Sequence, residues 1–481
     1  MTKSSASNDT DYDVIVVGGG PGGSTTATLI AQEGHRVLLL EKEQFPRYQI
    51  GESLLPSTIQ GICPLLGVSE ELENAGFPVK RGGTFRWGAN PEPWTFAFSE
   101  NPGVVTAAYQ VERAKFDDIM VRNAQKHGVT VKFQHQADGV LREGDRITGV
   151  RYRDAENNRL EATSQFVIDA SGEGSRLRGE VGGEREMSPD FRSIALFGYW
   201  AGGKRLPEPN SGNILTEAFD YGWIWYIPLA DDLTSVGIVL RREHADMLQG
   251  DSSQMETYRT LLSKAPIVSK YLDGVEMSTR APYDKLRVRK DYSYHQTKMW
   301  APGMALVGDA GLFVDPVFST GVHLATYGGL MAARSVNTVL AGELDETTCF
   351  DEFQLRMWRE YSVLYNFLVV FYQTHHEQDY FKAAQQITQQ GGSVRSVFAG
   401  LVAGVTSGDF DLSDSLEQVD SVLSSTEGGD IEGLREVPLM AETLKGFINT
   451  VRMQTGEEEG PMFTNGLAPT ADFRHWRVMS G

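Results

Sequence analysis

The amino-acid sequence predicts an α/β fold that combines a parallel sheet with an antiparallel sheet and a helical C-terminal region. Three observations support this prediction. A glycine-rich turn joins an apolar strand to a helix near the N-terminus. Aromatic-rich strands separated by Gly, Pro and Asn turns follow in the middle of the chain, and apolar positions at helical spacing run through residues 350–390.

The composition limits the possible partners. The 481 residues include 44 Lys and Arg against 64 Asp and Glu, which gives a formal net charge of −20. Nucleic acids and anionic membranes require concentrated positive charge, so we exclude both as main partners. The two cysteines, Cys63 and Cys349, are too few for a disulfide framework or a CxxC site, and we predict no metal.

Targeting and membrane segments are not evident in the sequence. Residues 1–11 are polar and lack the apolar core of a signal peptide. The longest strongly apolar stretch, Val363–Tyr372, is too short to cross a bilayer. We therefore expect a soluble, cytoplasmic protein without a membrane partner.

A β-α-β unit begins the parallel sheet. Tyr12–Val17 is a short apolar run with β-branched residues, which is typical of a buried parallel strand. Ser24–Glu33 predicts a helix that ends at Gly34, and Arg36–Glu41 predicts the next strand. This order is Rossmann-like.

The turn between the first strand and helix has glycines at dinucleotide-binding spacing: Gly18, Gly20 and Gly23. The first permits a tight turn, the second lets the backbone approach a pyrophosphate, and the third lets helix and strand pack closely. Glu41 ends the second strand, where an acid commonly binds a ribose hydroxyl. The alternative is a plain glycine turn with a surface glutamate, and the motif leaves NAD and FAD open.

The middle of the chain predicts an antiparallel substrate-binding sheet that is interleaved with the nucleotide-binding domain. Its strand candidates are Thr84–Trp87, Trp94–Phe98, Ile194–Trp200 and Trp223–Ile227. We assign 1–80, 107–180 and 290–348 to the nucleotide-binding domain, 81–106 and 181–289 to the substrate-binding domain, and 349–481 to the helical region. Within that region, the acidic, Ser- and Gly-rich segment 407–436 is a candidate disordered segment.

A second constellation favours FAD. The strand Ala305–Val307 runs into Gly308 and Asp309, which resembles the Gly-Asp motif of flavoprotein monooxygenases of the p-hydroxybenzoate hydroxylase type. In that family the aspartate contacts the ribityl chain, and Arg113 resembles its flavin-contacting arginine. The resemblance implies a Rossmann-like FAD-binding domain, with Asp309 and Arg113 among the FAD contacts. Asp309 could equally cap a helix.

One stretch departs from that family. Where the hydroxylases carry a short Asp-Gly motif for FAD and NAD(P)H, the chain has Asp169–Arg176, with Ser171 in place of the motif aspartate. There is also no second GxGxxG motif. The hypothesis is that the protein receives reduced FAD from a separate flavin reductase.

The segment Gly222–Pro228 contains Trp-x-Trp-x-Ile-Pro and resembles the flavin-dependent halogenases. Trp223 and Trp225 should face the same side of a strand. In that family, the two indoles form an apolar wall beside the flavin. This wall is thought to separate the substrate from the flavin peroxide, so that oxygen is not transferred directly to the substrate. The alternative is a core strand with two packed indoles.

Lys80 resembles the family's active-site lysine, with Arg81 as a rival for that position. The resemblance implies that a flavin C4a-hydroperoxide oxidises halide and that Lys80 presents the resulting hypohalous acid, or a chloramine, to the ring. Burial would lower the pKa of the lysine. Glu52, in the preceding Gly51–Ser53 segment, is a candidate to orient groups near the tunnel, or a surface carboxylate.

Asp315–Val322 resembles the family's halide-site segment. Thr320 and Gly321 are the candidate ligands for chloride or bromide, because small residues leave backbone N–H groups free to bind an anion. The alternative is an ordinary strand-to-helix turn.

Phe318 stands where the tryptophan halogenases carry a glutamate, so we predict that it gates a ring that activates itself. The resemblance implies a phenolic or tyrosyl group held on a carrier protein. Alternatives are a pyrrolyl-carrier halogenase and a flavin-dependent aromatic hydroxylase. The run Lys285–Lys290 is a candidate docking site for an acidic carrier, although most such runs are solvated surface.

Overall fold

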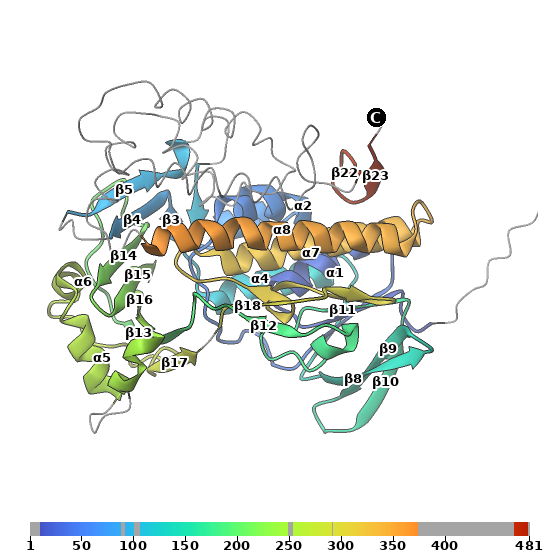
Figure 1. Ribbon diagram of the computed structural model, residues 1–481, viewed down its shortest axis with the longest axis horizontal. Coiled ribbons are helices and arrows are strands. Elements are labelled where there is room, and N and C mark those ends of the chain that lie inside the picture. The colour runs from blue at the N-terminus through green and yellow to red at the C-terminus, as the bar shows by residue number, and fades with distance from the viewer. Residues whose placement is uncertain are drawn as a thin grey trace, which may run out of the picture.

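Two large sheets organise the part of the chain that the computed structural model describes, which is residues 10–87, 92–100, 106–248, 254–290, 292–373 and 466–479 (Figure 1). One sheet lies in the part predicted to bind a nucleotide, and the other lies in the part predicted to bind the substrate. The long helix α8 (Glu346–Gln373) runs beside α7 (Thr320–Leu340) and spans both parts in the view of Figure 1.

The first sheet has six strands in the order β19-β20-β11-β1-β2-β7. Their bounds are β1 Val14–Val17, β2 Val37–Glu41, β7 Thr130–Phe133, β11 Phe166–Asp169, β19 Trp300–Ala301 and β20 Met304–Leu306. All neighbouring strands run parallel except β19, which is antiparallel to β20. The central strands are buried along their whole length, which explains their continuous apolar sequence.

Helix α1 (Pro21–Ala31) packs closely against α7, while α4 (Arg113–Lys126) lies on its other side. Glycines make the α1–α7 approach possible. A Cβ atom on Gly22 would lie 3.0 Å from the carbonyl oxygen of Ala325, and one on Gly329 would lie 2.7 Å from that of Gly22. Helix α1 is thereby fixed against α7, whose first residues belong to the predicted halide segment.

The second sheet has seven strands in the order β17-β13-β16-β15-β14-β4-β5. Their bounds are β4 Gly82–Arg86, β5 Trp94–Ala97, β13 Ser193–Trp200, β14 Ile214–Phe219, β15 Gly222–Ala230, β16 Leu233–Arg241 and β17 Arg287–Lys290. Neighbours are antiparallel apart from the parallel pair β4 and β14.

Alternate side chains of β15 point to opposite faces of the sheet and pack into two separate hydrophobic clusters. Ile224 and Tyr226 point to one face, where they pack with residues of α5 (Gln254–Leu262) and α6 (Pro266–Tyr271). Trp223, Trp225 and Ile227 point to the opposite face and join the main core, which also contains α7 and α8. The two tryptophans therefore share a face, as the sequence predicts.

Smaller elements connect the sheets. They are the strands β3 Val79–Lys80, β6 Ala108–Tyr109, β8 Gln136–Glu143, β9 Arg146–Arg153, β10 Arg159–Thr163, β12 Arg185–Met187, β18 Tyr294–Gln296 and β21 Leu312–Phe313. Short helices are α2 Cys63–Leu66 and α3 Ser69–Glu73, with a π-helical turn at Ser57–Ile62 and 3₁₀ turns at Phe98–Glu100, Arg178–Val181, Arg242–Leu248 and Gly308–Ala310.

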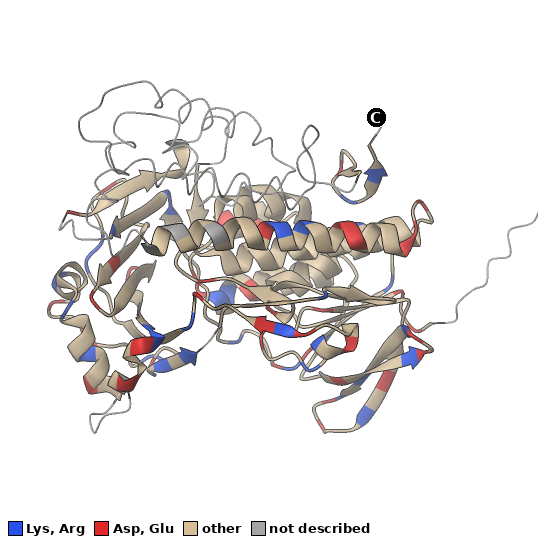
Figure 2. Ribbon diagram, viewed as in Figure 1, with Lys and Arg blue, Asp and Glu red and all other residues tan. Residues whose placement is uncertain are grey.

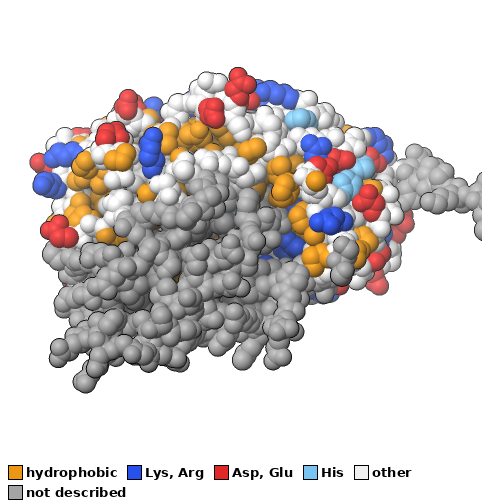
Figure 3. All heavy atoms as spheres, turned by 90° about the horizontal axis from the view of Figure 1, so that it is seen from above, with side chains coloured by type: hydrophobic (Ala, Val, Ile, Leu, Met, Phe, Trp, Pro, Cys, Tyr) orange, Lys and Arg blue, Asp and Glu red, His pale blue; other side chains and the backbone are white. Residues whose placement is uncertain are grey.

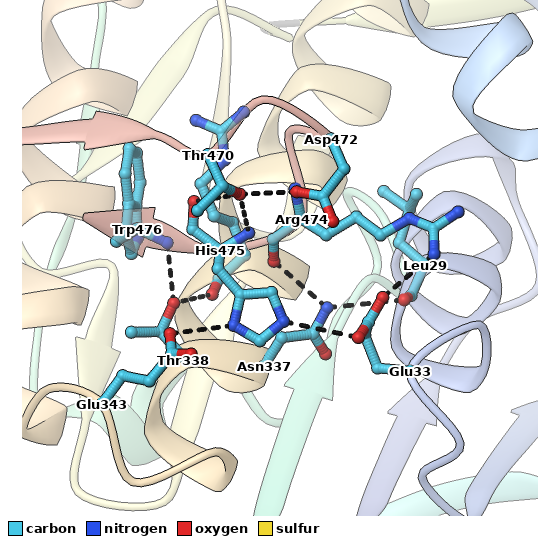
Figure 4. Close-up of polar contacts among 11 residues, drawn as sticks. Leu29, Glu33, Asn337, Thr338, Glu343, Thr470, Asp472, Arg474, His475 and Trp476 are labelled. Atoms are coloured by element: carbon cyan, nitrogen blue, oxygen red, sulfur yellow. Dashed lines mark hydrogen bonds and ion pairs between the residues drawn. The ribbon is translucent and has the colours of Figure 1, made fainter.

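Residues 466–479 form what we call the C-terminal clasp, a hairpin of β22 (Leu467–Pro469) and β23 (Trp476–Val478). The buried Trp476 donates hydrogen bonds from its backbone N to Thr338 Oγ1 (2.8 Å) and from Nε1 to Ser335 Oγ (2.9 Å), both on α7. His475 and Arg474 reach Glu33, just beyond α1 (Figure 4). The clasp thus joins α1 to α7.

The clasp also reaches α8. Arg356 donates from Nη2 to the carbonyl oxygen of Leu467 (2.9 Å), and the guanidinium groups of Arg334 and Arg356 lie 4.5 and 4.8 Å from the Trp476 ring. Aromatic stacking of this kind adds to the burial of the indole. The hairpin holds together three helices that are distant in sequence.

The α/β fold with its parallel and antiparallel sheets is confirmed, and α8 confirms helix formation after Cys349. The hairpin was not anticipated within the region predicted as helical, and segment 407–436 lies outside the described residues. The division into domains stays a prediction.

Two absences hold for the residues described. No helix among them is both long and apolar enough to cross a bilayer. No group of three or more His, Cys, Asp or Glu is placed there to hold a metal ion. On the described surface visible in Figure 3, acidic and basic side chains are interspersed.

Candidate active site

The glycine turn has the geometry that a dinucleotide requires. Gly18 has a φ of +103°, and a Cβ atom there would lie 2.4 Å from the carbonyl oxygen of Ala170. A Cβ atom on Gly23 would lie 1.9 Å from that of Gly18. Gly20 differs, since the nearest atom to its Cβ position is Arg47 Nη2 at 3.6 Å. At Gly18 and Gly23 the turn packs against backbone atoms that leave no room for a side chain. At Gly20, the position predicted to face a pyrophosphate, no other described segment comes closer than 3.6 Å to the Cβ position.

Glu41 and Arg47 flank this opening. Glu41 is buried and accepts hydrogen bonds from the backbone N of Gly19 (2.7 Å) and of Glu43 (2.8 Å), which fixes its carboxylate beside the turn. Arg47 bonds to Asp117 at 2.6 Å and lies over the Phe45 ring at 4.5 Å. The sequence analysis did not predict a role for Arg47. Its place six residues after Glu41, the acid that ends the second strand, could have marked it as a candidate. These residues fit a dinucleotide.

Arg113 lies buried at the start of α4. Its Nε and Nη2 donate to the Asp117 carboxylate at 2.7 and 2.9 Å, and Nη1 donates to the carbonyl oxygens of Ile50 and Gly51. Although burial opposes it, Arg113 and Arg47 hold the pKa of Asp117 below its usual value. The arginine therefore anchors the loop before Glu52.

Asp309 lies in the 3₁₀ turn after β20. Burial raises the pKa of its carboxyl to about 6, an effect that the nearby Arg113 opposes. Its backbone oxygen accepts a hydrogen bond from Tyr294 (2.6 Å). The structure thus places Asp309 and Arg113 within electrostatic reach of each other, on elements that flank the dinucleotide turn.

Lys80 is almost wholly buried, with 2% of its surface exposed, on the short strand β3. Its Nζ donates to the carbonyl oxygen of Leu54 (3.0 Å) and lies 5.6 Å from the Phe98 ring. Burial lowers the pKa of this amine to about 7. Arg81, its rival in the sequence, is exposed. The surroundings of Lys80 are those expected of a reactive amine.

Glu52 is also buried, two residues before the carbonyl that binds Lys80. Its Oε1 accepts a hydrogen bond from Tyr199 (2.7 Å), while Oε2 has no hydrogen-bond partner. Burial raises the pKa of this carboxyl to about 7, and the hydroxyl groups of Tyr199 and Ser235 moderate the increase. The surface-carboxylate alternative is wrong.

The tryptophan pair forms a wall on the core side of β15. The two ring centroids are 6.0 Å apart. Gly237 lies opposite Trp225 on β16, where a Cβ atom would come within 2.1 Å of the indole, so this glycine makes room for the ring. Trp225 Nε1 donates to Ser235 Oγ (3.2 Å), and Trp223 Nε1 donates to the Tyr372 hydroxyl (2.7 Å).

The predicted halide segment, Asp315–Val322, runs into the N-terminus of α7, which begins at Thr320. Ser319 before it has a left-handed φ of +65°. Asp315 was not nominated from the sequence, although it lies in the quoted segment. Its Oδ1 accepts hydrogen bonds from Val317 N (2.9 Å) and Tyr372 OH (3.0 Å), while burial raises its pKa to about 7. Tyr372 thereby connects this segment to Trp223.

Phe318 lies in an aromatic cluster and is buried. Its ring centroid is 4.6 Å from Phe371, 5.1 Å from Phe367 and 6.0 Å from Phe85. Successive ring contacts lead from Phe85 through Phe96 to Phe98, against which Lys80 lies. The structure therefore brings Lys80 and Phe318 to one continuous aromatic cluster.

Gly321 and the basic run lie apart from these contacts. A Cβ atom on Gly321 would meet the Phe313 ring at 2.8 Å, so this glycine allows close packing.

Most of the basic run Lys285–Lys290 forms the edge strand β17, coloured mainly as Lys and Arg in Figure 2. Arg287 stacks on Tyr48 at 3.9 Å, and Arg289 pairs with Glu173 at 3.5 Å, so part of the run is engaged within the protein.

Comparison with known proteins gives consistent matches. A family model described as tryptophan halogenase matches residues 13–107 and 101–403. A tryptophan 2-halogenase from Chondromyces crocatus is 36% identical over 404 residues, covering 82% of this chain and 75% of that protein. A flavin-dependent halogenase from Armillaria mellea, armH3, is 33% identical and covers 69% of each chain.

Two solved structures extend the comparison. The myxobacterial chondrochloren halogenase CndH, described as a variant of FAD-dependent halogenases, has 46% sequence identity and a TM-score of 0.77, covering 97% of this chain and 99% of that one. The flavin-dependent brominase Bmp2 has 26% identity and a TM-score of 0.73, covering 85% of this chain and 99% of its own.

Proposed function

The chain belongs to the tryptophan halogenase family, and from that premise we propose that it halogenates a phenolic ring, with Lys80 presenting the electrophilic halogen. It is a flavin-dependent halogenase that uses FAD and halide, as its relatives do. The burial of Lys80 beside the aromatic cluster that contains Phe318 is the observation that supports the proposal most directly.

The open glycine turn, with Gly18, Gly20, Gly23, Glu41 and Arg47, would hold the pyrophosphate and ribose of FAD. The predicted contacts of Arg113 and Asp309 belong to the same proposal. Bound FAD, when reduced, supplies the electrons with which oxygen oxidises halide. Flavin-dependent halogenases generally receive reduced flavin from a separate reductase. Ser171 supports this arrangement, because it stands in place of the hydroxylase aspartate and bonds to Asp169.

Lys80 can act in either protonation state near neutral pH. The ammonium form can donate a hydrogen bond to hypohalous acid, and the neutral amine can accept halogen on nitrogen. The lowered pKa of about 7 makes both forms available. Trp223 and Trp225 would separate this space from the flavin, and Thr320 and Gly321 would bind the halide at the start of α7.

Phe318 supports an electron-rich substrate. A buried phenylalanine among other phenylalanines can neither accept a proton nor stabilise a cationic ring by its charge. The ring must then supply its own activation, as a phenol does. Tryptophan is a second candidate, because one relative is named a tryptophan 2-halogenase.

We further propose that the phenolic group is carried on a carrier protein. The exposed basic residues Arg289 and Lys290 on the edge strand β17 support docking of an acidic partner. A pyrrolyl carrier is the alternative substrate.

Product mass tests these proposals. The protein would be incubated with an added flavin reductase, FAD, oxygen and chloride or bromide. Four substrates would be tested in parallel: free tyrosine, free tryptophan, a carrier protein loaded with tyrosyl groups and one loaded with pyrrolyl groups. We expect a halogen mass increment on the tyrosyl carrier. Halogenation of tryptophan alone would overturn the proposal of a phenolic substrate. Equal rates with free tyrosine and with the tyrosyl carrier would overturn the proposal that the substrate is bound to a carrier protein. Charge reversal at Arg289 and Lys290 should slow only the loaded substrate.

A further inference from the structure

The buried carboxyl of Glu52 is linked to a half-buried tyrosine by an unbroken chain of hydrogen bonds. Tyr48 OH lies 2.7 Å from Tyr199 OH, and Tyr199 OH donates to Glu52 Oε1 at 2.7 Å. Tyr199 and Glu52 are almost wholly buried, whereas Tyr48 is partly accessible beside Arg287. The three groups thus cross from the protein surface to its interior.

The inner end of this chain reaches the tryptophan wall. The interaction between Ser235 and Glu52 lowers the pKa of the carboxyl, and the same hydroxyl accepts a hydrogen bond from Trp225 Nε1 at 3.2 Å. Glu52 Oε2 is buried and has no hydrogen-bond partner. A buried carboxylate oxygen that accepts no hydrogen bond is costly when ionised, which favours the protonated form of the group.

Halide oxidation consumes a proton that a buried site must obtain from solvent. The balanced half-reaction is FADH2 + O2 + X⁻ + H⁺ → FAD + HOX + H2O. Oxygen accepts four electrons, two from the flavin and two from halide. Substitution of the ring returns no proton, because Ar–H + HOX gives Ar–X + H2O. The net uptake is therefore one proton per turnover.

We infer that Tyr48, Tyr199 and Glu52 form a proton relay that delivers the proton consumed in halide oxidation. Tyr48 gives its hydroxyl proton to Tyr199 and takes another from solvent. Tyr199 passes its own proton to Glu52 Oε1, and the resulting carboxylic acid donates its proton on the side of the tryptophan wall. Each hydroxyl loses one proton and gains one, so only Glu52 changes its charge.

Charged groups lie around each member of the relay. Arg287 and Arg289 face Tyr48, Arg113 and Glu112 act on Glu52, and Arg280 with Glu112 faces the neighbouring Tyr283. Burial raises the pKa of Glu52 to about 7, so the carboxyl can both accept and release a proton.

Tyr199→Phe and Tyr48→Phe test the relay, because each removes one hydroxyl and keeps its ring. Tyr283→Phe is the matched control, since its ring packs 4.7 Å from that of Tyr199 but its hydroxyl is not part of the chain. Stopped-flow reoxidation of bound reduced FAD with bromide needs no organic substrate. We expect both relay variants to slow the bromide-dependent phase about 10–100-fold at pH 8, with a smaller solvent isotope effect.

A second readout uses the flavin-free protein. Difference infrared titration, with Glu52→Gln to identify the band, should show the carboxyl titrating at higher pH in Tyr199→Phe than in the wild type, because a hydrogen bond to the ionised form is lost. Wild-type rates and isotope effects in both relay variants would overturn the relay, as would an equal slowing in Tyr283→Phe. Should Tyr199→Phe not fold, the partly accessible Tyr48→Phe decides alone.

Discussion

Trp476 in the C-terminal clasp and Lys80 near the aromatic cluster are both almost wholly buried, but their surroundings differ. Around Trp476, Arg356 pairs with Glu352 at 2.6 Å and Arg334 donates to the carbonyl oxygen of Phe473. Lys80 has one carbonyl partner and, among the described residues, no ion pair. Compensated charge allows burial to add stability, whereas uncompensated charge shifts pKa values toward neutrality.

The same contrast extends to Glu52 and Asp315, which with Lys80 we call the reaction cluster. Each of the two carboxyls has hydrogen-bond donors on one oxygen and no partner on the other. Burial raises both pKa values to about 7. The comparison teaches that burial without a compensating charge brings the pKa values of all three groups near neutrality, which is the property their proposed roles require.

The largest expected effect belongs to Lys80. Lys80→Met should lower halogenation about 1000-fold, because no amine remains to present the halogen, while the midpoint of thermal unfolding should stay the same or rise. The control is Lys115→Met, whose amine also lies near a ring, Phe77, but is exposed. If Lys80→Met retained halogenation, the proposed role of Lys80 in presenting the halogen would be wrong.

Trp476→Ala should have the opposite profile. Removing a fully buried indole should reduce the free energy of unfolding by about 3–5 kcal/mol, measured by urea denaturation. The turnover of the folded enzyme should remain near that of the wild type. Glu343→Gln is the matched control at the clasp, since Glu343 is half exposed and, among the described residues, forms an ion pair with His475. Loss of this pair should cost under about 1 kcal/mol. If Trp476→Ala lost much of its turnover but little of its stability, the proposed difference between the clasp and the reaction cluster would be wrong.

Glu52→Gln should change how stability depends on pH. Below about pH 4.5 the carboxyl is protonated in both the folded and the unfolded chain. As the pH rises toward 7, the unfolded chain releases this proton first, so the wild type loses stability, by about 3 kcal/mol once the pH is above 7. Urea denaturation of the flavin-free variant should lack this loss. Parallel curves for variant and wild type would contradict the raised pKa.

The smallest effect concerns Asp315 and halide. Because its pKa is raised to about 7, ionisation above that pH should place a negative charge on the halide segment and raise the KM for bromide. We expect an increase of about 10-fold between pH 6.5 and 8.5, corresponding to about 1.4 kcal/mol. Asp315→Asn should keep a constant KM across this range, and an unchanged pH dependence in the variant would place the halide elsewhere.

The nucleotide-binding part was predictable because its signals are local. The strand Val14–Val17 and the spacing of Gly18, Gly20 and Gly23 each follow from a few consecutive residues, and the observed φ of Gly18 agrees with its predicted role. The common face of Trp223 and Trp225 follows from strand periodicity alone.

The partners of the reaction cluster were not predictable. Tyr199 is distant in sequence from Glu52, and Tyr372 is distant from Asp315, so only the folded chain brings these pairs together. No local pattern marks a tyrosine as the partner of a carboxylate. The C-terminal clasp was missed for the same reason, because Trp476 acquires its role only against α7 and α8.

The clasp has a consequence for how the protein is made. Residues 466–479 leave the ribosome after every other described element, yet Trp476 fills a site between α7 and α8. Until Trp476 is in place, its site between α7 and α8 leaves apolar surface on these helices uncovered, and exposed surface of this kind makes a folding chain prone to aggregation. Synthesis of the last strand therefore sets the moment at which the enzyme can complete its core.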